Sequence, residues 1–172
     1  VVNDDLVAPG HGFDTHPHRD MEIISYVVSG ELTHADSMGN KSTLSRGQIQ
    51  YMSAGTGVAH SEHNFGDEEL RFLQIWILPD QKRHTPAYGD VKLDWSLRRD
   101  QWLHIVSPAG GGAPVEIHQD ANLYAAELSA GKPLSFEVRE GRQAYLVLME
   151  GDALINGLRL GARDGLESTE ET

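Results

Sequence analysis

Short runs of β-forming residues recur along this sequence, and long amphipathic helical patterns are almost absent. The runs are rich in branched and aromatic residues, and Gly, Pro, Asn or Asp bound them, as is typical of strands and the turns between them. Many short strands at this spacing indicate a sandwich or a closed barrel. We therefore predict an all-β chain, with strands at residues 22–28, 31–35, 48–52, 70–78, 102–106, 122–128, 134–138, 144–149 and 153–155.

A polar segment divides the sequence into two halves. The apolar run LRFLQIWIL ends at Leu78, and the polar stretch that follows holds two prolines before Trp95. With 172 residues, the chain can form two small domains that each bury a core. The sequence predicts an N-terminal barrel at 1–80, a linker at 81–95 and a C-terminal barrel at 96–172.

The second half is similar to the first in its glycine positions but not in its metal-binding residues. A shift of the sequence by 121 residues aligns Gly30 with Gly151, each between a hydrophobic run and an acidic residue. The same shift aligns His16 with Glu137. This internal repeat predicts two copies of one scaffold, of which the second carries no metal ligands.

Two histidines open the strongest chemical pattern, Gly10-x5-His16-x-His18-x3-Glu22. Side chains two residues apart on a strand share one face and lie roughly 6.5 Å apart along it. His16 and His18 can therefore point together into a barrel. Glu22 has the same parity as His18, so it shares that face if the strand continues.

A second segment offers another pair on one face, His60 and Glu62, after Gly55 and Gly57. These glycines permit a tight turn that brings the second pair across from the first. Three imidazoles and one carboxylate make a four-ligand set with open positions for water or substrate. The chain has no cysteine, so the ligands are nitrogen and oxygen. Such a set suits Fe(II), Mn, Ni, Cu or Zn.

Charge and hydropathy narrow the range of partners. The formal net charge of −12 argues against direct binding to nucleic acid, which needs a clustered basic face. No apolar run approaches the roughly 18 residues of a membrane span, and the first residues have no basic region like that of a signal peptide. We expect a cytoplasmic protein without a membrane segment. Since the first residue is not Met, we also expect native residues to be missing from the front.

The two metal patterns resemble the two motifs of the cupin superfamily, the second as Gly55-x-Gly57-x2-His60-x3-Asn64. The segments THPHRDMEI, DSMGNK, MSAGTG and HSEHN are similar to sequences of the bacterial branch of the pirin family. This resemblance implies a bicupin, two small antiparallel jelly-roll barrels, of which only the first binds metal. It also implies strands before residue 1 and after residue 172, so we expect both barrels to be truncated.

The resemblance to pirins assigns the metal ligands as His16, His18, His60 and Glu62. Ordinary cupins use the glutamate of the first motif, which is Glu22 in this sequence. We expect Glu62 to be the fourth ligand and keep Glu22 as a neighbouring group or alternative ligand. Iron(II) is the first choice of metal, with Cu, Ni, Mn, Zn and Co as alternatives.

Bacterial pirins are associated with quercetin 2,3-dioxygenase activity, so the resemblance implies a flavonol and O2 as substrates. Glu62, or Glu22 in its place, then takes the proton of the flavonol 3-hydroxyl. Phe13 is the aromatic residue best placed to line the substrate cavity. Hydrolysis by metal-bound water and a vestigial barrel without activity are alternatives. The main alternative is a metal- and redox-dependent regulatory module that binds a protein partner, which the acidic surface would suit if that partner were basic.

The patterns around the remaining histidines give weaker support for metal binding. His63 has the opposite parity to His60 and Glu62, which predicts that it points away from the metal. His34, near a turn, is expected to be a satisfied or exposed side chain, as are the histidines at positions 84, 104 and 118. His11 precedes the first motif and could line the mouth of the barrel, but we expect it at a solvated loop position.

Overall fold

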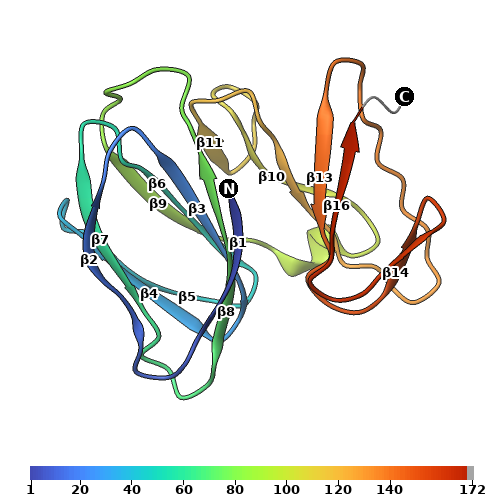
Figure 1. The fold of residues 1–172 in the computed structure, drawn as a ribbon, viewed down its shortest axis with the longest axis horizontal. Coiled ribbons are helices and arrows are strands. Elements are labelled where there is room, and N and C mark those ends of the chain that lie inside the picture. Colours follow the sequence, from blue (N-terminus) through green and yellow to red (C-terminus); the bar gives the residue numbers. More distant parts are fainter. Residues whose placement is uncertain (170–172) are drawn as a thin grey trace. The chain divides into compact units, whose positions relative to one another are not determined.

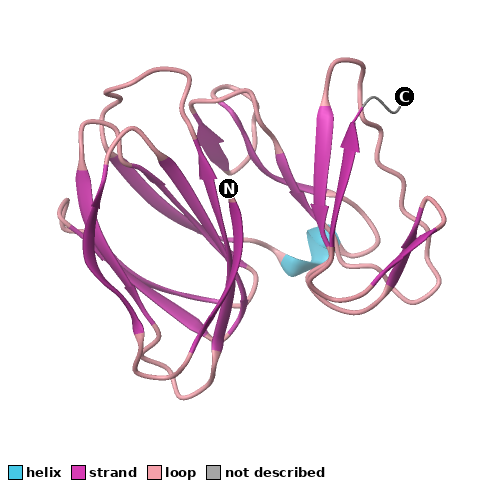
Figure 2. Cartoon of the chain, viewed as in Figure 1, coloured by secondary structure: helices cyan, strands magenta, loops and turns pink. Residues whose placement is uncertain are grey.

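The computed structural model describes residues 1–169, whose regular structure is almost entirely β (Figures 1 and 2). These residues form sixteen strands and one short 3-10 helix, η1 (Trp95–Arg98). The prediction of an all-β chain is confirmed. No helix among the described residues is long and apolar enough to cross a membrane. The chain divides into two compact units, Val1–Gly131 and Lys132–Thr172.

Two antiparallel sheets build the barrel of the first unit (Figure 1). One sheet has five strands in the order β1-β8-β3-β6-β9, and the other has four in the order β2-β7-β4-β5. The five strands are β1 (Val2–Val7), β8 (Leu70–Ile77), β3 (Glu22–Ser29), β6 (Gln48–Ser53) and β9 (Ala87–Lys92). The four strands are β2 (Gly12–His18), β7 (Val58–His63), β4 (Glu31–Asp36) and β5 (Lys41–Ser45).

The core of the barrel lies between these two sheets. At one end Phe72 and Val27 of the larger sheet pack with Leu32 and Leu44 of the smaller sheet, and all four are fully buried or nearly so. At the other end Ile23 and Met52 pack with Val58 of β7. Burying each of these side chains contributes roughly 1.5–3 kcal/mol to folding. The polar side chains described below lie between these two apolar clusters on the same strands.

The outer face of the five-stranded sheet is also buried at its middle strands, β3 and β6, because later residues of the first unit cover it there. Glu22 and Ile24 are fully buried on this face, and Tyr26 is 6% exposed. The guanidinium of Arg98 donates a hydrogen bond to the hydroxyl of Tyr26 and lies 4.3 Å from the ring of Trp95. A three-stranded sheet completes this unit, with β10 (Leu103–Pro108) between β11 (Val115–Ile117) and β12 (Leu123–Ala125).

The second unit has two small antiparallel sheets. β13 (Gln143–Val147) pairs with β16 (Gly165–Thr169), and β14 (Ala153–Ile155) pairs with β15 (Leu158–Leu160). The predicted strand at 134–138 is wrong: its side chains alternate between apolar and polar, but the segment joins no sheet of the described chain. Residues with high strand propensity form a strand only where a neighbouring strand pairs with them. Conversely, part of the predicted linker forms β9, which pairs with β6 along its whole length.

Asn64, in the last position of the second cupin-like motif, connects the end of β1 to the loop between β7 and β8. Its fully buried side chain donates hydrogen bonds to the carbonyls of Val7 (2.9 Å) and Glu68 (2.7 Å) and accepts one from the amide of Gly66 (3.0 Å). Replacing Asn64 with alanine leaves these groups without partners, so we expect the free energy of unfolding to fall by about 2–4 kcal/mol.

Urea denaturation at constant m-value measures this loss. The matched control is Asn122→Ala, since Asn122 is exposed and bonds one histidine, His104; its effect should stay below about 0.5 kcal/mol. Equal stabilities of the two variants would contradict a connecting role for Asn64.

Candidate metal centre

Strands β2 and β7 place the three histidines. The two strands are antiparallel, and His16 lies directly opposite His60 in their register. Gly12 permits this close pairing, because a Cβ atom there would lie only 2.3 Å from the carbonyl oxygen of Glu62. Along β7, burial alternates so that His60 and Glu62 are buried while the residues between and after them are partly exposed. The alternation predicted from the sequence is therefore present.

A tight turn between β6 and β7 brings the second pair across from the first, as the glycines predict. Gly55 and Gly57 both have positive φ angles, +44° and +139°. At Gly55 a Cβ atom would also lie 2.0 Å from the carbonyl oxygen of His84. A side chain at this position is excluded by both the backbone conformation and the lack of space.

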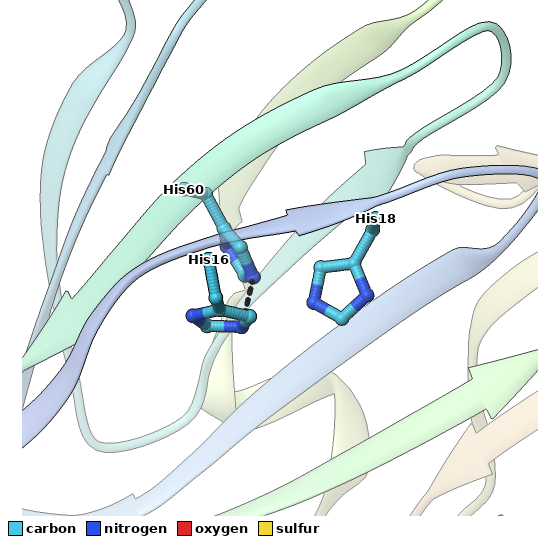
Figure 3. Close-up of side chains that lie close together, drawn as sticks. All are labelled: His16, His18 and His60. Atoms are coloured by element: carbon cyan, nitrogen blue, oxygen red, sulfur yellow. Dashed lines mark hydrogen bonds between the residues drawn. The ribbon is translucent and has the colours of Figure 1, made fainter.

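The imidazoles of His16, His18 and His60 converge on one point (Figure 3). Their ring centroids lie 4.6–4.9 Å apart, and one nitrogen from each ring lies within 4.8 Å of the others. The Nε2 atoms of His16 and His60 are 3.1 Å apart and share one hydrogen bond (Figure 3). Two nitrogens that bind one ion at about 2.0–2.1 Å are roughly 2.8–3.4 Å apart at octahedral or tetrahedral angles.

The protonation of the rings also fits a cation. Nδ1 of His16 lies 2.7 Å from the carbonyl oxygen of Asp14, which can only accept, so Nδ1 carries the proton and Nε2 keeps its lone pair. Nε2 of His18 is buried and has no hydrogen-bond partner within the described residues. A divalent ion would satisfy both atoms and replace the proton shared with His60.

Burial keeps the rings of His60 and His18 neutral. It lowers the pKa of His60 from 6.5 to about 3, with the imidazoles of His16 and His18 as further causes. Burial and the neighbouring His16 also lower the pKa of His18. Neutral imidazoles have the lone pairs that transition metals bind, so this site is prepared for a cation and not for protons.

Glu62 lies beside His60 but is held by the opposite sheet. Its carboxylate accepts hydrogen bonds from the side-chain amides of Gln50 (2.6 Å) and Gln74 (2.7 Å) and from the hydroxyl of Ser25 (3.2 Å). Ser25 is the register partner of both glutamines, so the three donors form one row across β6, β3 and β8. Burial raises the pKa of Glu62, and these hydrogen bonds act against that rise.

The carboxylate of Glu62 lies closest to a second set of nitrogens. One of its oxygens and a ring nitrogen from each of His34 and His60 lie within 4.8 Å of one another, and all three residues are buried. The group formed by His16, His18 and His60 does not include Glu62. Glu62 therefore adjoins the three-histidine cluster on the side of His60.

Glu22 lies on the other face of the five-stranded sheet. Its carboxylate accepts hydrogen bonds from the hydroxyl of Tyr51 (2.9 Å) and from Nδ1 and the backbone amide of His118 (2.7 and 2.8 Å). Between β2 and β3 the chain turns at Asp20, where φ is +50°. The strand that carries His18 therefore does not continue to Glu22, and the shared parity does not give a shared face.

An open hollow adjoins the histidine cluster beside His18. Its volume is about 440 Å³, and Pro17, Arg19 and Val58 are among the residues that line it. Phe13 lies at the other end of β2, opposite Glu62, and is 41% exposed. The rings of Trp76 and His18 pack at a right angle to each other, with 5.0 Å between centroids.

Sequence reasoning missed His34 and the polar row of Ser25, Gln50 and Gln74. His34 is fully buried and its Nε2 bonds Asp36, which fits the satisfied alternative of the prediction, but the sequence did not indicate that it lies beside His60 and Glu62. The available signal was a polar residue at an inward position with apolar residues two positions away, as in Ile23-x-Ser25-x-Val27. His63 points away from the cluster, as its parity predicts, and lies 3.3 Å from the carboxylate of Asp14.

Two family models match this chain: Pirin over residues 1–77 and the quercetinase C-terminal cupin domain over residues 104–172. A Pseudomonas aeruginosa protein, provisionally named a quercetin 2,3-dioxygenase, is 43% identical over 99% of this chain and 74% of its own length. The quercetin 2,3-dioxygenase of Escherichia coli K12 is 38% identical over 99% of this chain and 73% of its own. This chain belongs to the pirin family.

The solved structures agree with this assignment. The crystal structure of YhhW from Escherichia coli matches this pirin with a TM-score of 0.92 at 38% identity, over 99% of this chain and 72% of that one. YhhW was also solved as a bacterial pirin in complex with nickel(II), and that structure matches with a TM-score of 0.90 at 37% identity, over 99% and 73% of the two chains. The cupin fold is therefore shown for this pirin, and its histidine cluster suits a metal.

Proposed function

We propose that this pirin is a metal-dependent dioxygenase that opens the central ring of flavonols such as quercetin with O2 and releases carbon monoxide. The observation that carries the proposal is the convergence of three imidazoles beside a buried carboxylate and an open hollow. The names of the relatives at 38–43% identity support this choice of substrate. Iron(II) remains our first choice of metal, and copper, nickel, manganese, zinc and cobalt are compatible with the same ligands.

His16, His18 and His60 would hold the ion, and Glu62 is proposed as the fourth ligand or as the nearby base. When bound, the ion would lower the pKa of a coordinated hydroxyl and promote its reaction with dioxygen. The hollow beside His18 is within the roughly 300–1,000 Å³ that small-molecule sites occupy. Its apolar walls at Pro17 and Val58 suit an aromatic ring.

Glu62 has the properties of a proton acceptor for the flavonol 3-hydroxyl. Burial raises its pKa, which increases its affinity for a proton. Gln50 and Ser25 donate to one of its oxygens and Gln74 to the other. Each carboxylate oxygen has two lone pairs, so the oxygen bonded by Gln74 can accept one further hydrogen, from a bound water or, in its place, from the substrate hydroxyl.

Oxygen uptake on addition of quercetin tests the proposal. The protein is loaded separately with Fe(II), Cu(II), Ni(II) or Mn(II), and each run is paired with His60→Ala and with the metal alone. We expect one metal to give uptake equal to the flavonol consumed, and His60→Ala to reduce the rate at least about 100-fold. That loss exceeds the roughly 10–100-fold typical of residues around a metal's ligands.

The same experiment separates the two functional hypotheses. If the protein binds metal but no metal gives uptake above the metal-only control, the flavonol hypothesis is wrong for this chain. The regulatory module that binds a protein partner then becomes the better proposal, and association that depends on the oxidation state of the ion would be its test.

A further inference from the structure

The metal ligand His60 has a second ring nitrogen that faces the barrel interior. Nδ1 of His60 is buried and has no hydrogen-bond partner within the described residues, and the same holds for Nδ1 of His34. The two rings lie 5.3 Å apart between centroids. Two buried polar atoms without partners in one place are costly, since each has lost its hydrogen bonds to water.

Asp36 determines which nitrogen of His34 carries the proton. Nε2 of His34 lies 3.1 Å from a carboxylate oxygen of Asp36, and both side chains are fully buried. A carboxylate can only accept, so Nε2 donates, and Nδ1 of the neutral ring is left as an acceptor. Stacking on Tyr88, at 4.3 Å and 14° between planes, fixes the orientation of the His34 ring.

Metal binding makes Nδ1 of His60 a hydrogen-bond donor, which is what the acceptor Nδ1 of His34 lacks. When Nε2 of His60 binds an ion, the proton of the neutral ring must reside on Nδ1, which becomes a donor. His34 then offers an acceptor without a donor, and His60 a donor without an acceptor. One nitrogen of each ring and an oxygen of Glu62 lie within 4.8 Å of one another. One water joins polar atoms at this separation with hydrogen bonds of about 2.8 Å.

We propose that His34, held by Asp36, positions the metal ligand His60 through one buried water that also bonds Glu62. This inference rests on the metal site of the proposed function. Nδ1 of His60 donates to the water, and the water donates to Nδ1 of His34 and to the carboxylate of Glu62. Three hydrogen bonds are typical of a buried water. The resulting chain from Asp36 to the metal fixes the ring of His60 and increases the basicity of its Nε2.

Nickel(II) titration of the metal-free protein tests the inference. We expect His34→Leu to weaken nickel binding about 10–100-fold, the range typical of residues that orient a metal ligand. His34→Asn places an amide oxygen near the position of Nδ1 and should recover affinity to within about threefold of wild type. In Asp36→Asn the amide oxygen stays with the backbone amides of Met38 and Asn40, so the NH2 group faces Nε2 of His34. This removes the acceptor of His34 and should also weaken binding.

His63→Leu is the matched control, because His63 is on the same strand as His60 and also contacts an aspartate, Asp14. Its nickel affinity should equal that of wild type. Cobalt(II)-substituted protein gives a second readout: the Nδ1 proton of His60 should show a shifted NMR signal that exchanges slowly with solvent. In His34→Leu that signal should move or exchange faster, even where the thermal stability of the variant equals that of wild type.

The outcomes are distinct. Folded His34→Leu that binds nickel within twofold of wild type, with an unchanged cobalt spectrum, overturns the role of His34 and leaves the metal site intact. Equal losses in His34→Leu and His34→Asn also overturn it, because an acceptor at Nδ1 is then irrelevant. Wild-type protein that does not bind nickel(II) or cobalt(II) overturns both the metal site and this inference.

Discussion

Replacing His60 with alanine is expected to weaken nickel(II) binding at least about 100-fold, the largest loss of affinity among single substitutions at the site. Of the three proposed ligands, only His60 is almost fully buried, at 2% exposure. It also contacts both other imidazoles and adjoins Glu62. A competition titration against a chromophoric chelator measures the affinity, and dialysis followed by metal analysis gives the stoichiometry.

Glu22→Gln is the informative partner variant, because ordinary cupins use this glutamate as a ligand. Glu22 lies on the outer face of the sheet, where an amide can still bond the hydroxyl of Tyr51 and the backbone and ring of His118. We expect its nickel affinity to stay within about twofold of wild type. A loss comparable to that of His60→Ala would instead support the ligand set of ordinary cupins.

The histidine cluster could be predicted from the sequence because it depends on local alternation. His16 and His18 share one face of β2, while His60 and Glu62 share one face of β7. Only the pairing of these two strands had to be assumed. The same alternation predicts the wrong face for Glu22. The turn at Asp20 separates β2 from β3, so that even-numbered residues face inward on β2 and odd-numbered residues face inward on β3.

The environment of Glu62 could not be predicted in the same way. Ser25 and Gln50 are 25 residues apart, and Gln74 is 49 residues from Ser25; they meet only through the register of three strands. Likewise, His34 is buried because β4 lies between β5 and β7, a property of the whole sheet. Local patterns indicate inward positions, but long-range pairing decides which of those positions touch.

Exchanging Glu62 for glutamine should be far more disruptive than the similar size of the two side chains suggests. A carboxylate accepts at both oxygens, whereas an amide accepts at one atom and donates at the other. The glutamine NH2 group would therefore face the NH2 group of Gln74 or of Gln50. Neither amide can rotate freely, because Trp76 donates to the oxygen of Gln74 (2.8 Å) and Tyr88 to that of Gln50 (3.3 Å).

We expect Glu62→Gln to lower the free energy of unfolding by about 2 kcal/mol, the cost of one buried pair of donors that face each other. It should also reduce quercetin-dependent oxygen uptake at least about 100-fold, because the proposed proton acceptor is lost. Urea denaturation and oxygen uptake measure the two effects. Glu137→Gln is the matched control: Glu137 is exposed in the second unit, and its substitution should change neither quantity.

The double variant Glu62→Gln with Gln74→Glu separates the structural role of the carboxylate from its chemical role. Glutamate at position 74 accepts from Trp76 and from the new glutamine 62, whose oxygen still accepts from Gln50 and Ser25, so every donor regains an acceptor. Stability should therefore return to within about 0.5 kcal/mol of wild type. Oxygen uptake should stay low, because the carboxylate now lies on β8 instead of beside His60. If uptake recovers together with stability, Glu62 serves to satisfy its neighbours and another group accepts the proton; if stability does not recover, the pattern of donors and acceptors is not what makes Glu62 necessary.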